Sequence, residues 1–122
     1  MSQDTLSWLD SRLLVEALET DEPAILQDFY TLFLQQVQEL QQQLDTFSTP
    51  YDAEDLRLLA HKLKSSARTV GALALGEQLD ALERACLQNS SQATLEAMLA
   101  ATRQACAQTE LAVQDWLDAH AD

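Results

Sequence analysis

Basic residues are scarce in this chain. Its 122 residues include seven Lys and Arg against twenty Asp and Glu, which gives a formal net charge of −13. Nucleic acids and anionic membranes bind proteins through a basic face, so this balance argues against both as partners. No run of about 18 apolar residues occurs, so no segment is expected to span a membrane. The first ten residues also lack the basic start and apolar stretch of a signal peptide.

Glycine, proline and cysteine are scarce too, with two of each. Because few residues break a helix and long stretches consist of Leu, Ala, Gln and Glu, the composition predicts an all-α fold. Two cysteines cannot form a disulfide scaffold, and Cys86 and Cys106 fall among apolar helical positions, which predicts buried free thiols. We therefore expect one cytoplasmic domain over residues 1–122, a length that suits a single core.

What the sequence does contain is apolar residues at spacings of three and four. They predict five helices, at about 5–19, 22–46, 50–70, 73–88 and 92–119. The apolar stripe of the first helix comprises Leu6, Leu9, Leu13, Leu14 and Ala17. The stripe of the second comprises Ile25, Phe29, Phe33, Val37, Leu40 and Leu44. Short turns between helices with one apolar stripe each indicate an up-and-down antiparallel four-helix bundle at about 22–119, with the N-terminal helix capping one end.

Turn residues place the predicted helix ends. Asp21 is a candidate N-cap before Pro23, which a first helical turn tolerates. Thr49 before Pro50 resembles the same arrangement at the start of the third helix. Gly71 suits a left-handed C-terminal cap and ends that helix.

The third predicted helix gathers the rare positive charge around a histidine. On a helical wheel of about 100° per residue with Leu56 at zero, His61 lies at about 140° and is expected to face solvent. The core stripe comprises Leu56, Leu59, Ala60, Leu63, Ala67 and Val70. Three cations lie on the same side of the helix as the histidine: Arg57, Lys64 and Arg68. Lys62 points elsewhere. Ser65 is one turn ahead and small, so it leaves the ring open to an incoming group.

Four interpretations of His61 follow from residue chemistry. It is an ordinary surface histidine beside ion-pair partners, a metal ligand, a general base, or a nucleophile that accepts a phosphoryl group. Metal sites in bundles use Glu-x-x-His motifs or paired histidines, and neither is present. General-base catalysis needs an oriented acid or nucleophile and a pocket, which the sequence does not indicate. Imidazole is a competent nucleophile near neutral pH, and neighbouring cations would offset the added charge.

The stretch AHKLKSSARTVGALALGEQLDALE resembles the signature of histidine-containing phosphotransfer (HPt) domains. That signature has a phosphorylated histidine, a lysine three residues later, two small residues, a glycine about ten residues on, and spaced leucines that end in Leu-Glu. The matching positions are His61, Lys64, Ser65, Ser66, Ala67, Gly71, Ala72, Leu75, Leu79, Leu82 and Glu83. Ser65 departs from the pattern, because the family commonly has glycine there.

The resemblance implies that His61 relays a phosphoryl group, through Nε2, between aspartates of receiver domains. Lys64, with Arg57 and Arg68, would stabilise phosphoryl oxygens or complement the receiver. Ser65 and Ser66 would keep the approach clear, and Gly71 and Ala72 would be structural. Mg²⁺ would belong to the receiver partner, with no cofactor or metal on this chain. No phosphate-binding Gly-rich loop appears, so the chain would be a phosphoryl carrier rather than a stand-alone enzyme.

The partners implied are receivers of a hybrid sensor kinase and of response regulators. Tyr30, Leu32 and Leu34 lie beyond the second helix's stripe and would be extra core or an apolar docking patch. The alternatives are a helical adaptor that carries no phosphate, or the phosphoacceptor domain of a larger kinase. We expect a monomer, and Met1 with the full set of helices favours a free-standing protein.

Overall fold

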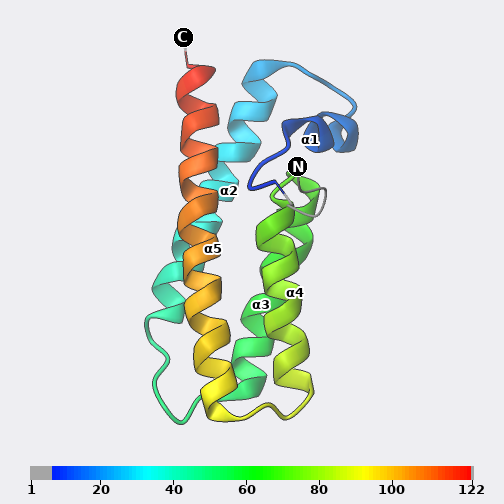
Figure 1. Cartoon of the computed structure of the whole chain (residues 1–122). Helices are drawn as coiled ribbons and strands as arrows, with labels where there is room; N and C mark the ends of the chain where they lie inside the picture. Colours follow the sequence, from blue (N-terminus) through cyan, green and yellow to red (C-terminus); the bar gives the residue numbers. More distant parts are fainter. Residues whose placement is uncertain (1–6, 122) are drawn as a thin grey trace, which may run out of the picture.

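A computed structural model describes residues 7–121, and within that range it contains five α-helices and no β-strand. They are α1 (Ser11–Leu18), α2 (Pro23–Leu44), α3 (Ala53–Thr69), α4 (Leu73–Leu87) and α5 (Gln92–Ala119). Figure 1 shows α2 to α5 running up and down as an antiparallel bundle, while α1 lies across the end at which α3 passes into α4. The predicted fold class is confirmed. None of the helices in residues 7–121 is long and apolar enough to cross a membrane.

The core runs between the four long helices. Its largest fully buried side chains include Tyr30, Phe33, Leu14, Leu56, Leu75, Leu79 and Leu95. At the N-terminal end of α2, the buried apolar residues lie one position later in the sequence than predicted. Leu26 and Tyr30 are buried, whereas Ile25 and Phe29, which were predicted to be core, are exposed. Both registers have helical spacing, and the contacts of Tyr30 with Trp116 of α5 and with the Val70 carbonyl favour the one that buries the tyrosine.

The two cysteines are free and buried, as predicted. Burial raises the pKa of the Cys106 thiol to about 12 and also raises the pKa of Cys86. Both thiols therefore stay protonated at neutral pH and pack as small apolar groups.

Two predicted helix starts, those of α1 and α3, and one predicted N-cap, that of α2, are wrong. Asp10 caps α1 by accepting a hydrogen bond from Arg12 N, so that helix begins at Ser11; residues 5 and 6 lie outside the described residues. Asp52, not Thr49, caps α3 by accepting from Asp55 N, and Pro50 lies before the helix. At α2 the N-cap is Glu22, without a side-chain bond, although Pro23 does occupy the first turn.

Gly71 joins α3 to α4 and docks the N-terminal segment. Its φ of +92° is left-handed, which confirms the predicted C-terminal turn. The Gly71 carbonyl oxygen accepts a 2.9 Å hydrogen bond from Asp10 N, and Ala74 N donates to the Ser7 carbonyl. A Cβ atom at Gly71 would lie 2.0 Å from the Asp10 carbonyl oxygen. This turn therefore fixes α1 at the end of the bundle, two to three helical turns along α3 from His61.

Candidate functional site

His61 projects from the middle of α3, as the wheel predicted. Its side chain is 64% exposed. One ring nitrogen, Nδ1, lies 2.9 Å from Oε2 of Glu83 on α4. An ionised carboxylate can only accept a hydrogen bond, so this contact places the imidazole proton on Nδ1. The lone pair of the neutral ring is then on Nε2, the nitrogen that points away from Glu83.

Glu83 is the buried centre of the site. Its side chain is only 10% exposed, and its other oxygen, Oε1, accepts a 2.7 Å bond from Lys64 Nζ. The Arg57 guanidinium lies 3.7 Å from Oε2. The hydrogen bond from Lys64 is the main reason that the pKa of the Glu83 carboxyl is below its usual value, against burial, which raises it. The carboxylate is therefore ionised at neutral pH and orients both His61 and Lys64.

Lys64 is bound by two carboxylates, which corrects the prediction of a solvent-facing cation. Besides Glu83, it donates a 3.1 Å bond to Asp80, one turn earlier on α4. Its side chain is 19% exposed, and these bonds, from Glu83 first and Asp80 second, raise its pKa. Arg84 in turn donates to the second Asp80 oxygen at 3.0 Å. A wheel of α3 alone cannot show these partners, because they all come from α4.

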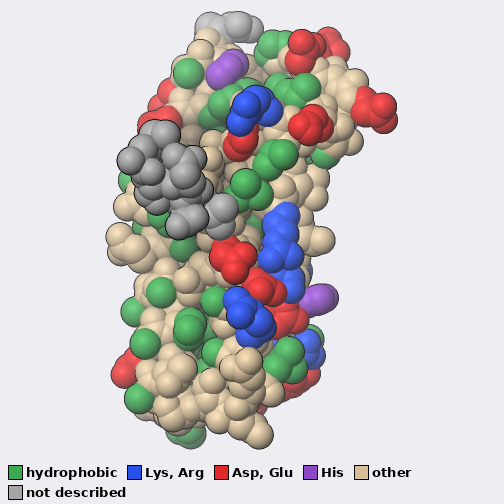
Figure 2. Space-filling view, turned by 45° about the vertical axis from the view of Figure 1, so that its right-hand side comes forward, with side chains coloured by type: hydrophobic (Ala, Val, Ile, Leu, Met, Phe, Trp, Pro, Cys, Tyr) green, Lys and Arg blue, Asp and Glu red, His purple; other side chains and the backbone are tan. Residues whose placement is uncertain are grey.

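Arg57 and Arg68 do not surround the ring as free cations either. Arg57 is half-buried and forms a bidentate pair with Glu54, one turn before it on α3. Arg68 is exposed and lies two turns beyond His61, with its stem against Gly76 of α4. Figure 2 shows the result as a band of interleaved basic and acidic side chains on this side of the molecule. The predicted cluster of three cations is thus one exposed arginine and two ion-paired residues.

The small residues after His61 lie where the signature implies. Ser65, one turn ahead, is exposed, and Ser66 is half-buried and faces α2. Gly71 and Ala72 are buried in the α3–α4 turn, where the Ala72 amide donates to the Ala67 carbonyl. The exposed Ser65 leaves the ring accessible from the C-terminal side of α3.

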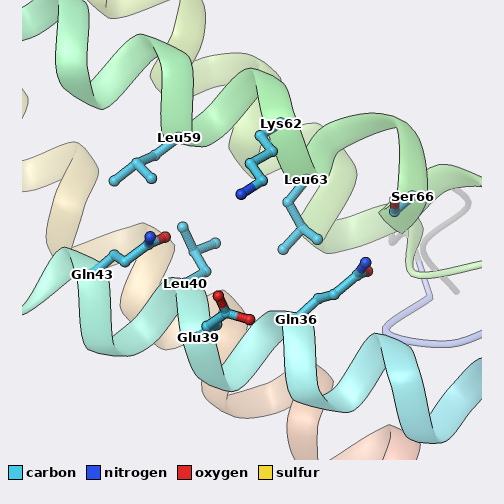
Figure 3. Close-up of a pocket in the computed structure, with 8 residues that line it drawn as sticks. All are labelled: Gln36, Glu39, Leu40, Gln43, Leu59, Lys62, Leu63 and Ser66. Carbon is cyan, nitrogen blue, oxygen red and sulfur yellow. The ribbon is translucent and has the colours of Figure 1, made fainter.

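A groove lies between α2 and α3. Its middle part, shown in Figure 3, has a volume of about 180 Å³ and lies between side chains that the two helices direct toward each other. Gln36 and Ser66 link this part to a second hollow of about 270 Å³, whose walls include the exposed Phe29 and Leu32. Leu59 and Gln43 link it to a third at the other end, next to the exposed Leu58. A channel with both polar and apolar walls therefore runs along one flank of the histidine helix.

Of the predicted extra residues on α2, Tyr30 is core and Leu32 is surface. Tyr30 is fully buried and its hydroxyl donates a 2.9 Å bond to the Val70 carbonyl. Leu34 is partly buried against the core, whereas Leu32 is 55% exposed. The extra-core interpretation is confirmed for Tyr30, and the docking patch stays a prediction for Leu32.

The roles of Glu83 and Asp80 escaped the sequence analysis. Glu83 was noted only as the last letter of the signature, and Asp80 was not singled out. The available clue was their spacing on α4, since positions 80 and 83 flank the core leucines Leu79 and Leu82 on the side that meets α3. Within residues 7–121, no three His, Cys, Asp or Glu side chains are grouped so that they could hold a metal ion.

Comparison with known proteins identifies the family. No curated protein and no solved structure matched the chain. A family model described as "Hpt domain" matches residues 25–120, which is most of the chain and includes His61, its carboxylate partners and both walls of the groove. Members of this family act in phosphorelays together with receiver domains. The protein therefore belongs to the Hpt domain family and has a phosphotransfer-related role.

Proposed function

We propose that this protein relays a phosphoryl group between aspartates of two receiver domains, with His61 as the phosphorylated residue. The observation that carries the proposal is the hydrogen bond of Nδ1 to Glu83 on a ring that is 64% exposed. It leaves Nε2 both unprotonated and accessible. A surface histidine without such a partner would exchange its proton between the two nitrogens and would offer Nε2 as a nucleophile only part of the time.

Each bond that forms or breaks during the transfer can be assigned to these ring atoms and to the receiver's aspartyl phosphate. The Nε2 lone pair attacks phosphorus of an aspartyl phosphate, the bond from phosphorus to the carboxylate oxygen breaks, and the carboxylate leaves with the electron pair. The ring becomes an imidazolium whose Nδ1 proton faces Glu83, so the buried carboxylate stabilises the charge that develops. When a second aspartate attacks phosphorus, the bond to Nε2 breaks and the neutral ring returns. The receiver would supply the aspartates and Mg²⁺.

Receiver docking would use the groove between α2 and α3. Three exposed apolar residues line it, Phe29 and Leu32 at one end and Leu58 at the other. Exposed apolar side chains along a groove are typical of a protein-binding site. A receiver that covers this groove would bring its aspartate to the exposed edge of the imidazole. Ser65, in place of the usual glycine, lies between the groove and His61 and would set how closely the partner approaches.

The setting of the relay is part of the same proposal. Two free thiols suit the reducing cytoplasm, and a net charge of −13 opposes self-association. We therefore infer a cytoplasmic monomer in which residues 1–122 form one domain. A dimer in light scattering would contradict the monomer.

Transfer of label from a phosphorylated receiver tests the function. The receiver is phosphorylated with a radioactive small-molecule donor, freed of excess donor, and mixed with the wild type or His61→Gln. We expect acid-labile, alkali-stable label on the wild type and none on the variant, because phosphohistidine but not phosphoaspartate survives alkali. His120→Gln is the matched control and should be labelled like the wild type.

Two other outcomes would contradict the relay. If neither protein acquires label but both bind the receiver, the protein is an adaptor. If label reaches the wild type only from an ATP-dependent kinase domain, and never from a receiver, the protein is a kinase phosphoacceptor domain.

A further inference from the structure

Asp80 binds a cation that lies one turn from His61. The two helices meet here in antiparallel register, so that His61 faces Glu83, Lys64 faces Asp80, and Arg68 lies against Gly76. Lys64 is one turn from His61 on α3, within the range at which side chains of a helix interact. Its ammonium is held on the α4 side of the ring, at 2.7 Å from Glu83 and 3.1 Å from Asp80.

A phosphoryl group on Nε2 would lie on the opposite side of the ring. Nδ1 faces α4 through Glu83, and Nε2 is across the five-membered ring from it. To donate a hydrogen bond to a phosphoryl oxygen there, the Lys64 ammonium would have to move away from α4, and this movement competes with its bonds to the two carboxylates. Release from Glu83 would leave the more buried carboxylate without its strongest partner, whereas Asp80 is more exposed and keeps its bond to Arg84. Asp80 has no contact with the ring, so it is the partner that can be exchanged.

We propose that Asp80 is a positioning residue that restrains Lys64 and so shortens the lifetime of the phosphoryl group on His61. The inference rests on the proposed function, because it assumes that His61 is phosphorylated. Two anions, the Asp80 carboxylate and the phosphoryl group, compete for one ammonium. Arg84 binds the other oxygen of Asp80 at 3.0 Å and fixes the carboxylate in place. A relay intermediate gains from such competition, since a phosphoryl group held less tightly passes more readily to the next aspartate.

The lifetime of the phosphorylated protein tests this proposal without a partner. His61 is phosphorylated with phosphoramidate, a donor from which the Nε2 attack releases ammonia, and the donor is then removed. Water then attacks phosphorus, the bond to Nε2 breaks, and inorganic phosphate is released. Loss of phosphohistidine is followed by ³¹P NMR. We expect Asp80→Asn to lengthen the half-life by about two- to fivefold, the range for freeing one partly exposed ion-pair partner. Asp80→Glu, which keeps the carboxylate, should restore a half-life near that of the wild type.

Two controls separate the position of Lys64 from the mere loss of a negative charge. Glu77→Gln removes a carboxylate one turn away that pairs with Arg84 and not with Lys64, and it should leave the half-life unchanged. In a Lys64→Met background the effect of Asp80→Asn should disappear, which a double-mutant cycle measures directly. A thermal melt of each variant shows that the lifetime is compared between folded proteins.

Different results would overturn the proposed function and the role of Asp80. If phosphoramidate and phosphorylated receivers both leave the wild type unlabelled, the proposed function fails and this inference fails with it. If the wild type is labelled but Asp80→Asn has the wild-type half-life, or if its effect persists without Lys64, only the role of Asp80 is overturned. An equal effect of Glu77→Gln would also overturn it, because it would assign the change to net charge.

Discussion

Glu83 links the imidazole of His61 to the ammonium of Lys64 through the two oxygens of one carboxylate. This residue therefore decides the tautomer of the ring and, together with Asp80, the position of the cation. Its own charge is secured by Lys64, whose hydrogen bond opposes the cost of burial, and the Arg57 guanidinium lies 3.7 Å from Oε2. At the residue scale the site is a buried anion with cations around it, rather than the cationic cluster that the sequence of α3 suggested.

The first prediction concerns Glu83→Gln and acid. Because the pKa of the Glu83 carboxyl is lowered in the folded protein, its ionised form stabilises the fold at pH values above the unfolded pKa. That contribution is lost as the pH falls through the lowered, folded-state pKa. We expect Glu83→Gln to decrease the free energy of unfolding by about 1–2 kcal/mol at neutral pH, the range for a charged hydrogen bond that is replaced by a neutral one. In acid, well below about pH 4, the wild type and the variant should become equally stable.

Urea unfolding followed by circular dichroism at both pH values measures this difference. Glu96→Gln is a suitable control, because Glu96 is an exposed residue of α5. A loss of stability that is the same at neutral and acidic pH would show that the side-chain amide disturbs packing and that the charge is not responsible.

At the scale of elements, the α3–α4 turn connects the site to the rest of the bundle. Gly71 allows the left-handed turn, and its carbonyl oxygen accepts a hydrogen bond from the Asp10 amide. The carbonyl oxygen of the preceding residue, Val70, accepts a hydrogen bond from the buried Tyr30 hydroxyl. Three elements, α1, α2 and α3, therefore meet at this one turn. Its geometry sets the end of α3 and with it the register in which α3 faces α4.

The second prediction is that Gly71→Ala destabilises the protein by about 2–4 kcal/mol, because it combines an unfavourable positive φ with a steric clash. The added Cβ would lie 2.0 Å from the Asp10 carbonyl oxygen, so α1 must move away. The only other glycine of the chain provides the control. Gly76 is within α4, where an added Cβ meets the side chain of the exposed Arg68, and we expect Gly76→Ala to change stability by less than about 1 kcal/mol. Thermal melts measure both, and equal losses would contradict the special role of the turn.

Helical periodicity predicted all five helices, but local chemistry did not fix where α1 and α3 begin. Between positions 49 and 52 the chain offers two candidate caps, Thr49 and Asp52, and only the fold decides that Asp52 binds the free amide of Asp55. The partners of Lys64 were equally hidden, since they lie 16 and 19 positions later on another helix. Exposure of His61 follows from one helix, whereas the ion pairs depend on the register between two, which a sequence pattern does not specify.

For the whole molecule, the distribution of charge matters more than its sum. Five of the seven basic residues lie on α3 and α4, and the other two are Arg12 and Arg103. Three of these five are paired with carboxylates on the same two helices: Arg57, Lys64 and Arg84. The face around His61 is thus close to neutral in a chain with a net charge of −13. A neutral, partly apolar face can approach an acidic receiver site that the rest of the surface would repel.

The third prediction follows from that surface and concerns Leu32 of α2. Leu32 is 55% exposed at the wall of the groove, so a receiver that docks there buries it. Leu32→Gln should weaken receiver binding by about fivefold or more, as expected for an apolar contact inside an interface. Isothermal titration with the receiver measures the dissociation constant. Labelling of His61 by phosphoramidate should stay the same, because the imidazole and Glu83 are untouched.

Leu111→Gln is the matched control for Leu32. Leu111 is 61% exposed on α5, outside the groove, so its substitution removes a similar apolar area that the partner does not cover. If both variants weaken binding equally, the receiver docks elsewhere or senses only overall surface polarity. The expected result is that Leu32→Gln alone weakens binding, while both variants accept a phosphoryl group at the wild-type rate. Docking and chemistry would then occupy separate parts of one face. The groove would select the partner, and the bond between His61 and Glu83 would prepare the nucleophile.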